Sequence, residues 1–545
     1  MDSGLSAALY EVQMDTAFKP LLLAAAMALC VPSAQAASTL VYCSEASPAG
    51  FDPSQYTSGT EFDASAETVF NRLTQFKRGG TDVEPGLAEK WEVSDDGLNY
   101  TFHLRNGVKF HTTDYFKPTR DFNADDVLFT FNRLLDPNDP FRKAYPSESP
   151  YFTDMGMNTT IKQVEKVDDQ TVRFHLYNID AAFIQNLAMS FASIQSAEYA
   201  AQLIKQGKAG DINLKPIGTG PFVFKRYQKD AQIRYVGNKD YWKPADVKLD
   251  NLIFSITTDP ATRLQKLKTD ECQISGYPRP QDIEEAQKDP NLKVLSQAGF
   301  NLGFLAYNVT HPPLDQLKVR QALDMAIDKP AIIKAVYQGA GQLAQNALPP
   351  AQWSFDPKIK DAPHDPEKAK QLLKEAGIAP GTQINLWAMT VQRASNPNAR
   401  MSAQMIQADW AKIGIKANIV SYEWGEYIKR AKAGEHDVMI YGWTGDNGDP
   451  DNWLGVLYSC AAVNGSNYAK WCNPGYDKLV TQAKLTSNRD ERIKLYQQAQ
   501  NILKNDVPIT PIANSKVFQP MRKEVQDFKL SPFGLTPFYG VSLSK

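Results

Sequence analysis

GLAEKWEVSDDGLNYTFHLRNGVKFH, residues 86–111, contains the clearest strand pattern of the chain. Apolar and polar residues alternate over 100–104, and Asn106-Gly107 follows as a turn. Residues 172–176 alternate in the same way. A period of two is the spacing of side chains on one face of a strand. The two segments are therefore predicted to be strands with one face in the core.

Working outward, helical patterns alternate with strands in the second half of the chain. Asp365-Pro366 is expected to open a helix that Gly377 ends. A second helix is predicted over about 489–504. Short apolar segments at 384–387 and 438–441 are expected to be strands that flank helical segments. This interspersed order of elements predicts an α/β fold.

Composition and charge limit the possible classes of protein. The chain has 545 residues, of which 43% are hydrophobic and 22% charged, so it is long enough for two or three globular domains. The net charge is −2, from 59 basic and 61 acidic residues. This balance favours neither nucleic acid nor an anionic membrane surface as a partner.

The N-terminus is predicted to be a signal peptide over residues 1–36. Lys19 precedes an apolar run at 20–31, and Ala34-Gln-Ala36 is a cleavage signal. The run is too short to span a bilayer comfortably. Translation from Met14 would give a better signal, because residues 1–13 contain no basic side chain. The mature, exported protein is expected to begin at Ala37.

Five cysteines remain to be assigned. Cys30 follows Leu29 rather than the small residue that lipidation requires, so we place it in the discarded segment. The other four, in an oxidising compartment, predict two disulfides, for which three pairings are possible. Cys460–Cys472 is favoured because it closes a short loop, and Cys43–Cys272 then follows by elimination.

A candidate ligand-binding segment spans Tyr441–Trp453, with the sequence YGWTGDNGDPDNW. It fits neither a helix period nor a strand alternation and is predicted to be a loop. Glycines allow a backbone to approach a ligand closely, and a Trp beside a carboxylate gives an apolar wall next to a charge. This combination suits a small ligand with a cationic amine. The alternative is a solvated acidic turn.

Sequence signatures of catalysis were not found. The chain lacks a G-x-S-x-G elbow, an H-E-x-x-H helix motif and a Walker loop. Pro221 disrupts the only partial dinucleotide motif, at 218–220, and the six histidines show no metal-ligand spacing. We therefore predict a binding protein with no catalytic residues, no metal and no cofactor. An exported peptide hydrolase is the alternative.

Several long stretches together resemble one known family. They are residues 86–111, Asn123-Ala-Asp-Asp-Val127, Pro216-Ile-Gly-Thr-Gly-Pro-Phe222, Lys318-Val-Arg-Gln-Ala-Leu323, Leu40-Val-Tyr-Cys-Ser-Glu45, Thr57-Ser-Gly-Thr60, Gln392-Arg393, Asn396-Pro-Asn-Ala-Arg400, and the segment ending in the Cys460/Cys472 pair. In these stretches the chain resembles the solute-binding proteins of peptide ABC transporters (family 5), in particular the dipeptide-binding proteins of the Gram-negative periplasm. The match covers essentially all of residues 39–545.

This resemblance implies an α/β, two-lobed periplasmic binding protein fold (type II-like) with an extra domain and the ligand in the interlobe cleft. Residues 37–70, 222–300 and 517–545 would form a discontinuous domain I, 71–221 domain II, and 301–516 domain III, the second lobe. The implied partners are dipeptides and the transmembrane subunits of an ABC permease, with no nucleic acid, and the protein is expected to be a monomer.

The family's ligand-binding residues can be carried over position by position. Asp446 matches the carboxylate that receives the α-ammonium of the peptide, and Arg393 the guanidinium that receives its α-carboxylate. The positions that line the ligand backbone are Thr57, Ala394, Ser395, Trp443, Thr444 and Gly445. Ala394-Ser395 is smaller than the family pattern, which leaves the side-chain preference open.

Elementary chemistry agrees with these roles. The charged ends of a dipeptide lie about 7 Å apart, and the planar fork of an arginine suits a carboxylate. A fixed carboxylate and a fixed guanidinium would therefore measure the length of a zwitterion. Longer peptides, an opine-like zwitterion and haem remain alternative ligands.

Overall fold

A computed structural model describes residues 37–544. The predicted signal peptide, the choice of start codon and Cys30 lie outside the described residues. From Ser38 onward the chain forms one compact unit, so the division into three domains stays a prediction. Within residues 37–544, no helix is both long and apolar enough to cross a membrane.

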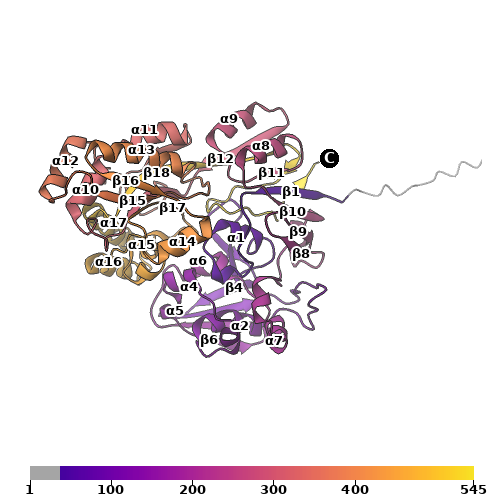
Figure 1. Cartoon of the computed structure of the whole chain (residues 1–545). Coiled ribbons are helices and arrows are strands. Elements are labelled where there is room, and N and C mark those ends of the chain that lie inside the picture. Colours follow the sequence, from indigo (N-terminus) through magenta and orange to yellow (C-terminus); the bar gives the residue numbers. More distant parts are fainter. Residues whose placement is uncertain (1–36, 545) are drawn as a thin grey trace, which may run out of the picture. The chain divides into compact units, whose positions relative to one another are not determined.

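One antiparallel sheet is built from four strands in the order β4-β5-β7-β6. Their bounds are Ala88–Val93, Asn99–Leu104, Thr171–Leu176 and Ile161–Asp168. The predicted strands at 100–104 and 172–176 are confirmed as β5 and β7, in which every second side chain is buried. Phe102 and Phe174 meet edge to face across the pair, with ring centroids 5.6 Å apart. The helices and strands of this region lie together in Figure 1, in purple.

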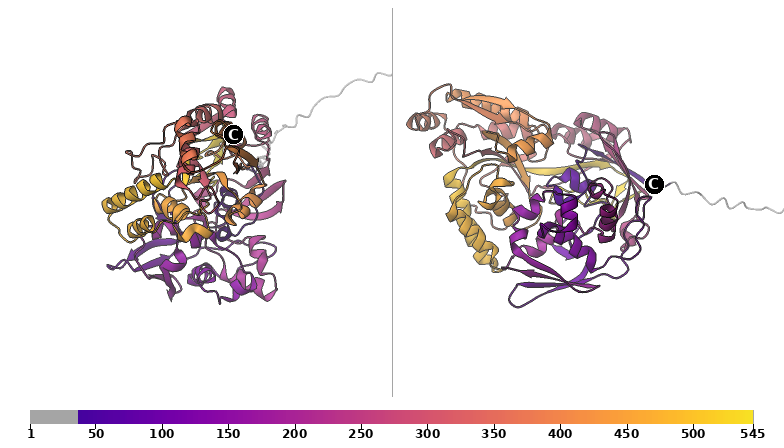
Figure 2. Two further views of the ribbon diagram at one scale, coloured as in Figure 1. Left: turned by 60° about the vertical axis from the view of Figure 1, so that its left-hand side comes forward. Right: turned by 60° about the horizontal axis from the view of Figure 1, so that its bottom comes forward.

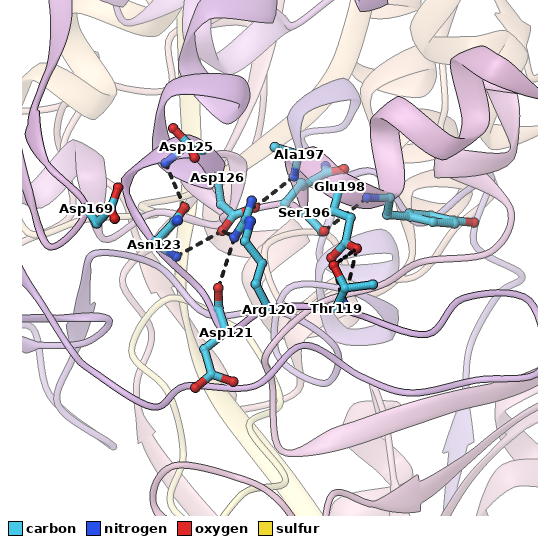
Figure 3. Close-up of polar contacts among 12 residues, drawn as sticks. Thr119, Arg120, Asp121, Asn123, Asp125, Asp126, Asp169, Ser196, Ala197 and Glu198 are labelled. Atoms are coloured by element: carbon cyan, nitrogen blue, oxygen red, sulfur yellow. Dashed lines mark hydrogen bonds and ion pairs between the residues drawn. The ribbon is translucent and has the colours of Figure 1, made fainter.

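The Asn123–Val127 motif has a structural role beside this sheet. Helix α2 (Ala124–Leu135) begins with a capping box between Asn123 and Asp126. Arg120 donates two hydrogen bonds to the Asp126 carboxylate, of 2.7 and 2.9 Å. The same carboxylate accepts the first amide of α7 (Ala197–Lys205), so one side chain joins the starts of two helices (Figure 3). This motif therefore holds the scaffold together and is not part of a ligand site.

A second, larger sheet has the strand order β16-β15-β17-β13-β18-β11-β1-β10-β9-β8. The long strand β18 (Ile509–Arg522) links its two halves: its first half pairs with β13 and β14, and its second half with β12 and β11 (Figure 2). The other strands are β1 (Thr39–Ser44), β8 (Phe222–Gln228), β9 (Gln232–Gly237), β10 (Asn251–Ile256), β11 (Ile274–Ser275), β12 (Leu292–Ala298), β13 (Asn301–Tyr307), β14 (Gly341–Leu343), β15 (Gln383–Trp387), β16 (Lys416–Val420) and β17 (Val438–Thr444).

Two helices predicted in the second half of the chain are present. The predicted helix after Asp365 is confirmed as α12 (Pro366–Glu375), with Asp365 as its N-cap and Gly377 at a φ of 73° beyond its end. The predicted helix near 489–504 is confirmed as α17 (Arg489–Asp506). Further helices are α1 (Gly59–Ala64), α4 (Pro150–Asp154), α8 (Pro260–Lys268), α9 (Pro280–Lys288), α10 (Leu317–Met325), α13 (Ala399–Lys412), α14 (Trp424–Lys432), α15 (Asp451–Tyr458) and α16 (Pro474–Lys484).

The prediction of a single loop over 441–453 was wrong at both ends. Strand β17 continues to Thr444, because β13 pairs with it along its whole length. Residues on both faces of β17 are buried, so the alternation of apolar and polar residues that marks a half-exposed strand is absent. Helix α15 begins at Asp451 directly after Pro450. The loop is limited to residues 445–450.

Two disulfides are present in the structure, Cys43–Cys272 and Cys460–Cys472. The first joins β1 to a residue two positions before the neighbouring strand β11, and its Cα atoms lie 5.8 Å apart. The second follows α15 and closes a short loop, with Cα atoms 4.6 Å apart. Both separations lie within the range that a disulfide can span.

Candidate functional site

A cavity of about 180 Å³ lies beside the end of β17. A single buried water requires about 10–15 Å³, so the space is large enough for an organic ligand. Seven of the eight residues predicted to contact a ligand line this cavity: Thr57, Arg393, Ala394, Ser395, Trp443, Thr444 and Asp446. They come from segments more than 300 residues apart in the sequence, which the fold brings together.

Gly445 is the predicted residue that does not line the cavity. It is buried, and a Cβ atom there would lie 2.5 Å from the ring of Phe300 and 2.8 Å from the indole nitrogen of Trp453. Its amide donates to the carbonyl of Phe300. Packing against two aromatic rings therefore requires a glycine here, and contact of Gly445 with a ligand stays a prediction.

Asp446 is the carboxylate of this cavity. The Tyr151 hydroxyl donates to its Oδ2, and its backbone amide donates to Asn452 Oδ1 at 2.9 Å. In residues 37–544 no lysine, arginine or histidine forms an ion pair with it. Burial raises the pKa of Asp446 to about 7, although the hydrogen bond from Tyr151 acts in the opposite direction. The ionised carboxylate therefore lacks a positive partner in the protein.

Aromatic rings surround this carboxylate. Tyr151, on α4, meets the ring of Trp443 edge to face at 5.9 Å and stacks on Phe62 at 6.0 Å. The indole nitrogen of Trp443 donates to Asn452 Oδ1 at 3.3 Å, which fixes the ring in the cavity wall. These rings limit the access of water to Asp446, which is half-buried, and this desolvation is the main cause of its raised pKa.

Arg393 has different surroundings from Asp446. Its guanidinium lies between two aromatic rings, 4.8 Å from the centroid of Tyr277 and 5.5 Å from that of Trp424. One of its terminal nitrogens, Nη1, donates to Glu45 Oε1 at 3.3 Å. Glu45 and the other nearby anionic groups hold the pKa of Arg393 above its usual value, although burial acts in the opposite direction. Arg393 is therefore charged and already has a carboxylate partner.

The loop that carries Arg393 is firmly anchored. Arg393 and Asn396 exchange two backbone hydrogen bonds, of 3.2 and 3.0 Å. The Ser515 hydroxyl donates to the Ala394 carbonyl, and the Tyr337 hydroxyl to the Ser395 carbonyl, both at 2.6 Å. The carbonyl groups of Ala394 and Ser395 therefore already have protein donors, and these two small residues serve mainly to shape the wall.

Strand β17 presents free backbone groups toward the cavity. In the described part of the chain, β13 pairs with all of β17, whereas β15 pairs with its first two residues only. Because the amide of Gly445 points to β13, the alternation of an antiparallel strand directs the backbone groups of Gly442 and Thr444 to the opposite, open edge. Both residues line the cavity. An extended peptide could form hydrogen bonds along this edge.

Sequence reasoning missed several residues of the site. Tyr151 lies 295 positions before Asp446, and no sequence pattern relates the two. Tyr277 and Trp424, which enclose Arg393, belong to no motif singled out above. Glu45 ends the Leu40–Glu45 motif, so the motif located it, but no sequence pattern pairs it with Arg393. Only the folded structure shows these contacts.

Comparisons with known proteins identify the family. The model of "Bacterial extracellular solute-binding proteins, family 5 Middle" matches residues 82–465. The chain is 70% identical over 530 residues to "Di/tripeptide-binding protein 1" of Pseudomonas aeruginosa (strain UCBPP-PA14), covering 97% of this chain and 98% of that protein. It is 50% identical over 506 residues to "Heme-binding protein A" of Haemophilus influenzae, covering 93% and 92% of the two chains.

A solved structure agrees with this result. The dipeptide binding protein from Pseudoalteromonas sp. SM9913, in complex with Met-Leu, superposes with a TM-score of 0.90 at 40% identity, covering 93% of this chain and all of that one. The mixed α/β architecture described above is thus that of a two-lobed solute-binding protein. By the family match, the extent of these identities and the shared fold, the chain belongs to family 5 of the bacterial extracellular solute-binding proteins.

Proposed function

We propose that this protein captures dipeptides by their charged termini in the periplasm of a Gram-negative bacterium and delivers them to an ABC permease. It acts as a monomeric binding protein and not as an enzyme. The observation that carries this proposal is Asp446: a half-buried carboxylate beside Tyr151 and Trp443, with no ion-pair partner in residues 37–544. A ligand ammonium would supply the missing charge.

The remainder of the cavity fits a short peptide. Arg393 provides a fixed cation for a carboxylate, and the open edge of β17 provides backbone donors and acceptors for a peptide bond. Backbone hydrogen bonds do not depend on ligand side chains, so they permit a range of sequences. The names of the relatives, which include di/tripeptide-binding proteins, support peptides as the ligand class.

Closure of two lobes on the ligand is part of the proposal. Asp446 follows β17, whereas the Tyr151 that contacts it belongs to the predicted domain II. Ser466 also donates to Asp154, the last residue of α4, at 2.6 Å. These contacts would have to break for the cleft to open, as in hinge motions between domains.

Calorimetry with a dipeptide library tests the proposal, with tripeptides, haem and N-acetylated dipeptides as separate arms. Free dipeptides are expected to bind. They should also raise the melting temperature of the protein by mass action. Stronger binding of haem or of acetylated peptides would contradict it. Analysis of the same mixtures for free amino acids decides between binding and hydrolysis, since release of amino acids would show an enzyme.

A further inference from the structure

Glu45 is a buried carboxylate in direct contact with Arg393. It follows β1 directly, and its side chain is 5% exposed. Two groups donate to the same oxygen, Oε1: the Thr60 hydroxyl at 2.6 Å and Arg393 Nη1 at 3.3 Å. The ion pair joins residues 348 positions apart. Glu45 thus occupies part of the hydrogen-bonding edge of the guanidinium proposed to hold the ligand carboxylate.

The remaining donors of Arg393 are only partly engaged. Nη1 also donates to the carbonyl of Gln392 at 3.2 Å, and Nη2 has a long contact of 3.5 Å with Thr60 Oγ1. The rings of Tyr277 and Trp424 cover the planar group. An arginine has five N–H donors, so a ligand carboxylate can bind beside Glu45 without displacing it. The ligand carboxylate then lies close to the negative charge of Glu45.

Other charged groups near this pair do not remove the repulsion between Glu45 and a ligand carboxylate. Arg263 is a further cation that interacts with Glu45, but in residues 37–544 it forms no ion pair with it and donates to the main-chain carbonyls of Thr257, Thr258, Gly276 and Tyr277. Glu61 is buried behind the pair and accepts from the Ala49 amide at 3.0 Å. Burial raises the pKa of Glu61. Glu45 is therefore the carboxylate in direct contact with Arg393.

We propose that Glu45 is a specificity-determining residue that weakens the selection of Arg393 for a free ligand carboxylate. The inference rests on the proposed function and deepens it. The ligand class is then defined by the free amino end, at Asp446, more than by the free carboxyl end. Peptides whose C-terminus is amidated, or continued by a further neutral group small enough for the cavity, are tolerated because Arg393 keeps Glu45 as its partner.

The experiment compares the affinity of one dipeptide as its free acid and as its C-terminal amide. Calorimetry is carried out on the parent protein, Glu45→Gln and Glu67→Gln. Glu67 is a matched control: it is buried and pairs with Arg72 at 3.2 Å, but neither residue lines the cavity around Arg393. Glutamine at position 45 retains an oxygen for the Thr60 hydroxyl and removes the charge.

Glu45→Gln is expected to raise the ratio of free-acid to amide affinity at least about tenfold, while Glu67→Gln leaves it within about twofold of the parent. An unchanged or lower ratio in Glu45→Gln would overturn the inference, because Glu45 would then only hold Arg393 in place. If Glu45→Gln does not fold, Glu45→Asp is used, since it draws the charge back from the guanidinium and should raise the ratio of free-acid to amide affinity by a smaller factor. A ratio in Glu45→Asp equal to that of the parent would overturn the inference. Failure of the parent to bind either dipeptide form would instead refute the proposed function.

Discussion

Asp446 and Arg393 are the two charged residues proposed to read the ends of a ligand, and their surroundings differ. Asp446 lies among aromatic rings with a hydroxyl donor and no cation among the described residues, so its charge is uncompensated. Arg393 is charged, stacked and already paired with Glu45. A ligand ammonium therefore gains a new ion pair at Asp446, whereas a ligand carboxylate shares a cation that already has a partner. We expect the amino end to contribute more to affinity.

The largest effect is expected for Asp446→Asn. Free dipeptides should lose about 3–5 kcal/mol of binding free energy, because the ligand ammonium would be buried without a counter-charge. An N-acetylated dipeptide should lose much less. Calorimetry measures both, with Asp437→Asn as the control, since Asp437 immediately precedes the same strand and lies outside the cavity. Equal losses for acetylated and free ligands would show that Asp446 does not read the ammonium.

A smaller effect is expected for Arg393→Gln. Free-acid dipeptides should lose about 1–2 kcal/mol, because the parent guanidinium divides its charge between Glu45 and the ligand. C-terminal amides should change little. Arg400→Gln, at an exposed position of α13, controls for loss of an arginine. If the free acid loses as much as it does in Asp446→Asn, the two residues contribute equally and the comparison fails.

The pH dependence of binding sharpens the comparison. The pKa of Asp446 is about 7 without ligand, and a bound ammonium would lower it. Below pH 7 binding must then release a proton, so affinity should rise up to about tenfold per pH unit between pH 5.5 and 7 and level off above. Calorimetry across this range, in buffers of different ionisation enthalpy, measures both quantities. Asp446→Asn should lack the dependence, and a flat profile in the parent would contradict the raised pKa.

The smallest effect concerns stability without ligand. The pKa of Asp446 in the folded protein exceeds the ordinary value of 3.8 for an aspartate, so the unfolded chain loses this proton first as pH rises. The carboxylate therefore destabilises the folded state increasingly from about pH 4 to pH 7. Asp446→Asn should melt about one to a few degrees above the parent at pH 8, with no gap at pH 4. A melting temperature of the parent above that of Asp446→Asn at pH 8 would contradict this expectation.

Most of the elements that the sequence predicted have a partly exposed face, whereas the strand predicted at 438–441 is fully buried. Strands β5 and β7 and helix α12 alternate or repeat apolar residues because one side faces water. Strand β17 has neither pattern because neighbours cover both of its faces, and its extension to Thr444 was missed. Local capping signals such as Asp365-Pro366 were read correctly, since they act within a single turn.

The candidate site was predictable to a different degree for each residue. Asp446 and Arg393 followed from the family resemblance, and the structure places both at one cavity. The difference between their surroundings depends on Tyr151, which contacts Asp446 from 295 positions away in the sequence, and on Glu45, which contacts Arg393 from 348 positions away. Contacts of that range depend on tertiary packing, and no local pattern encodes them. Gly445 was carried over from the same resemblance; in the structure it packs against two aromatic rings, and its part in ligand binding stays a prediction.

The most direct test of the central claim compares one dipeptide in three forms on the parent protein: free, N-acetylated and C-terminally amidated. Calorimetry at pH 7.5 gives the loss of binding free energy for each modification. The unequal charges at Asp446 and Arg393 predict that acetylation weakens binding by at least about tenfold more than amidation. A loss on amidation equal to or greater than the loss on acetylation would contradict the claim.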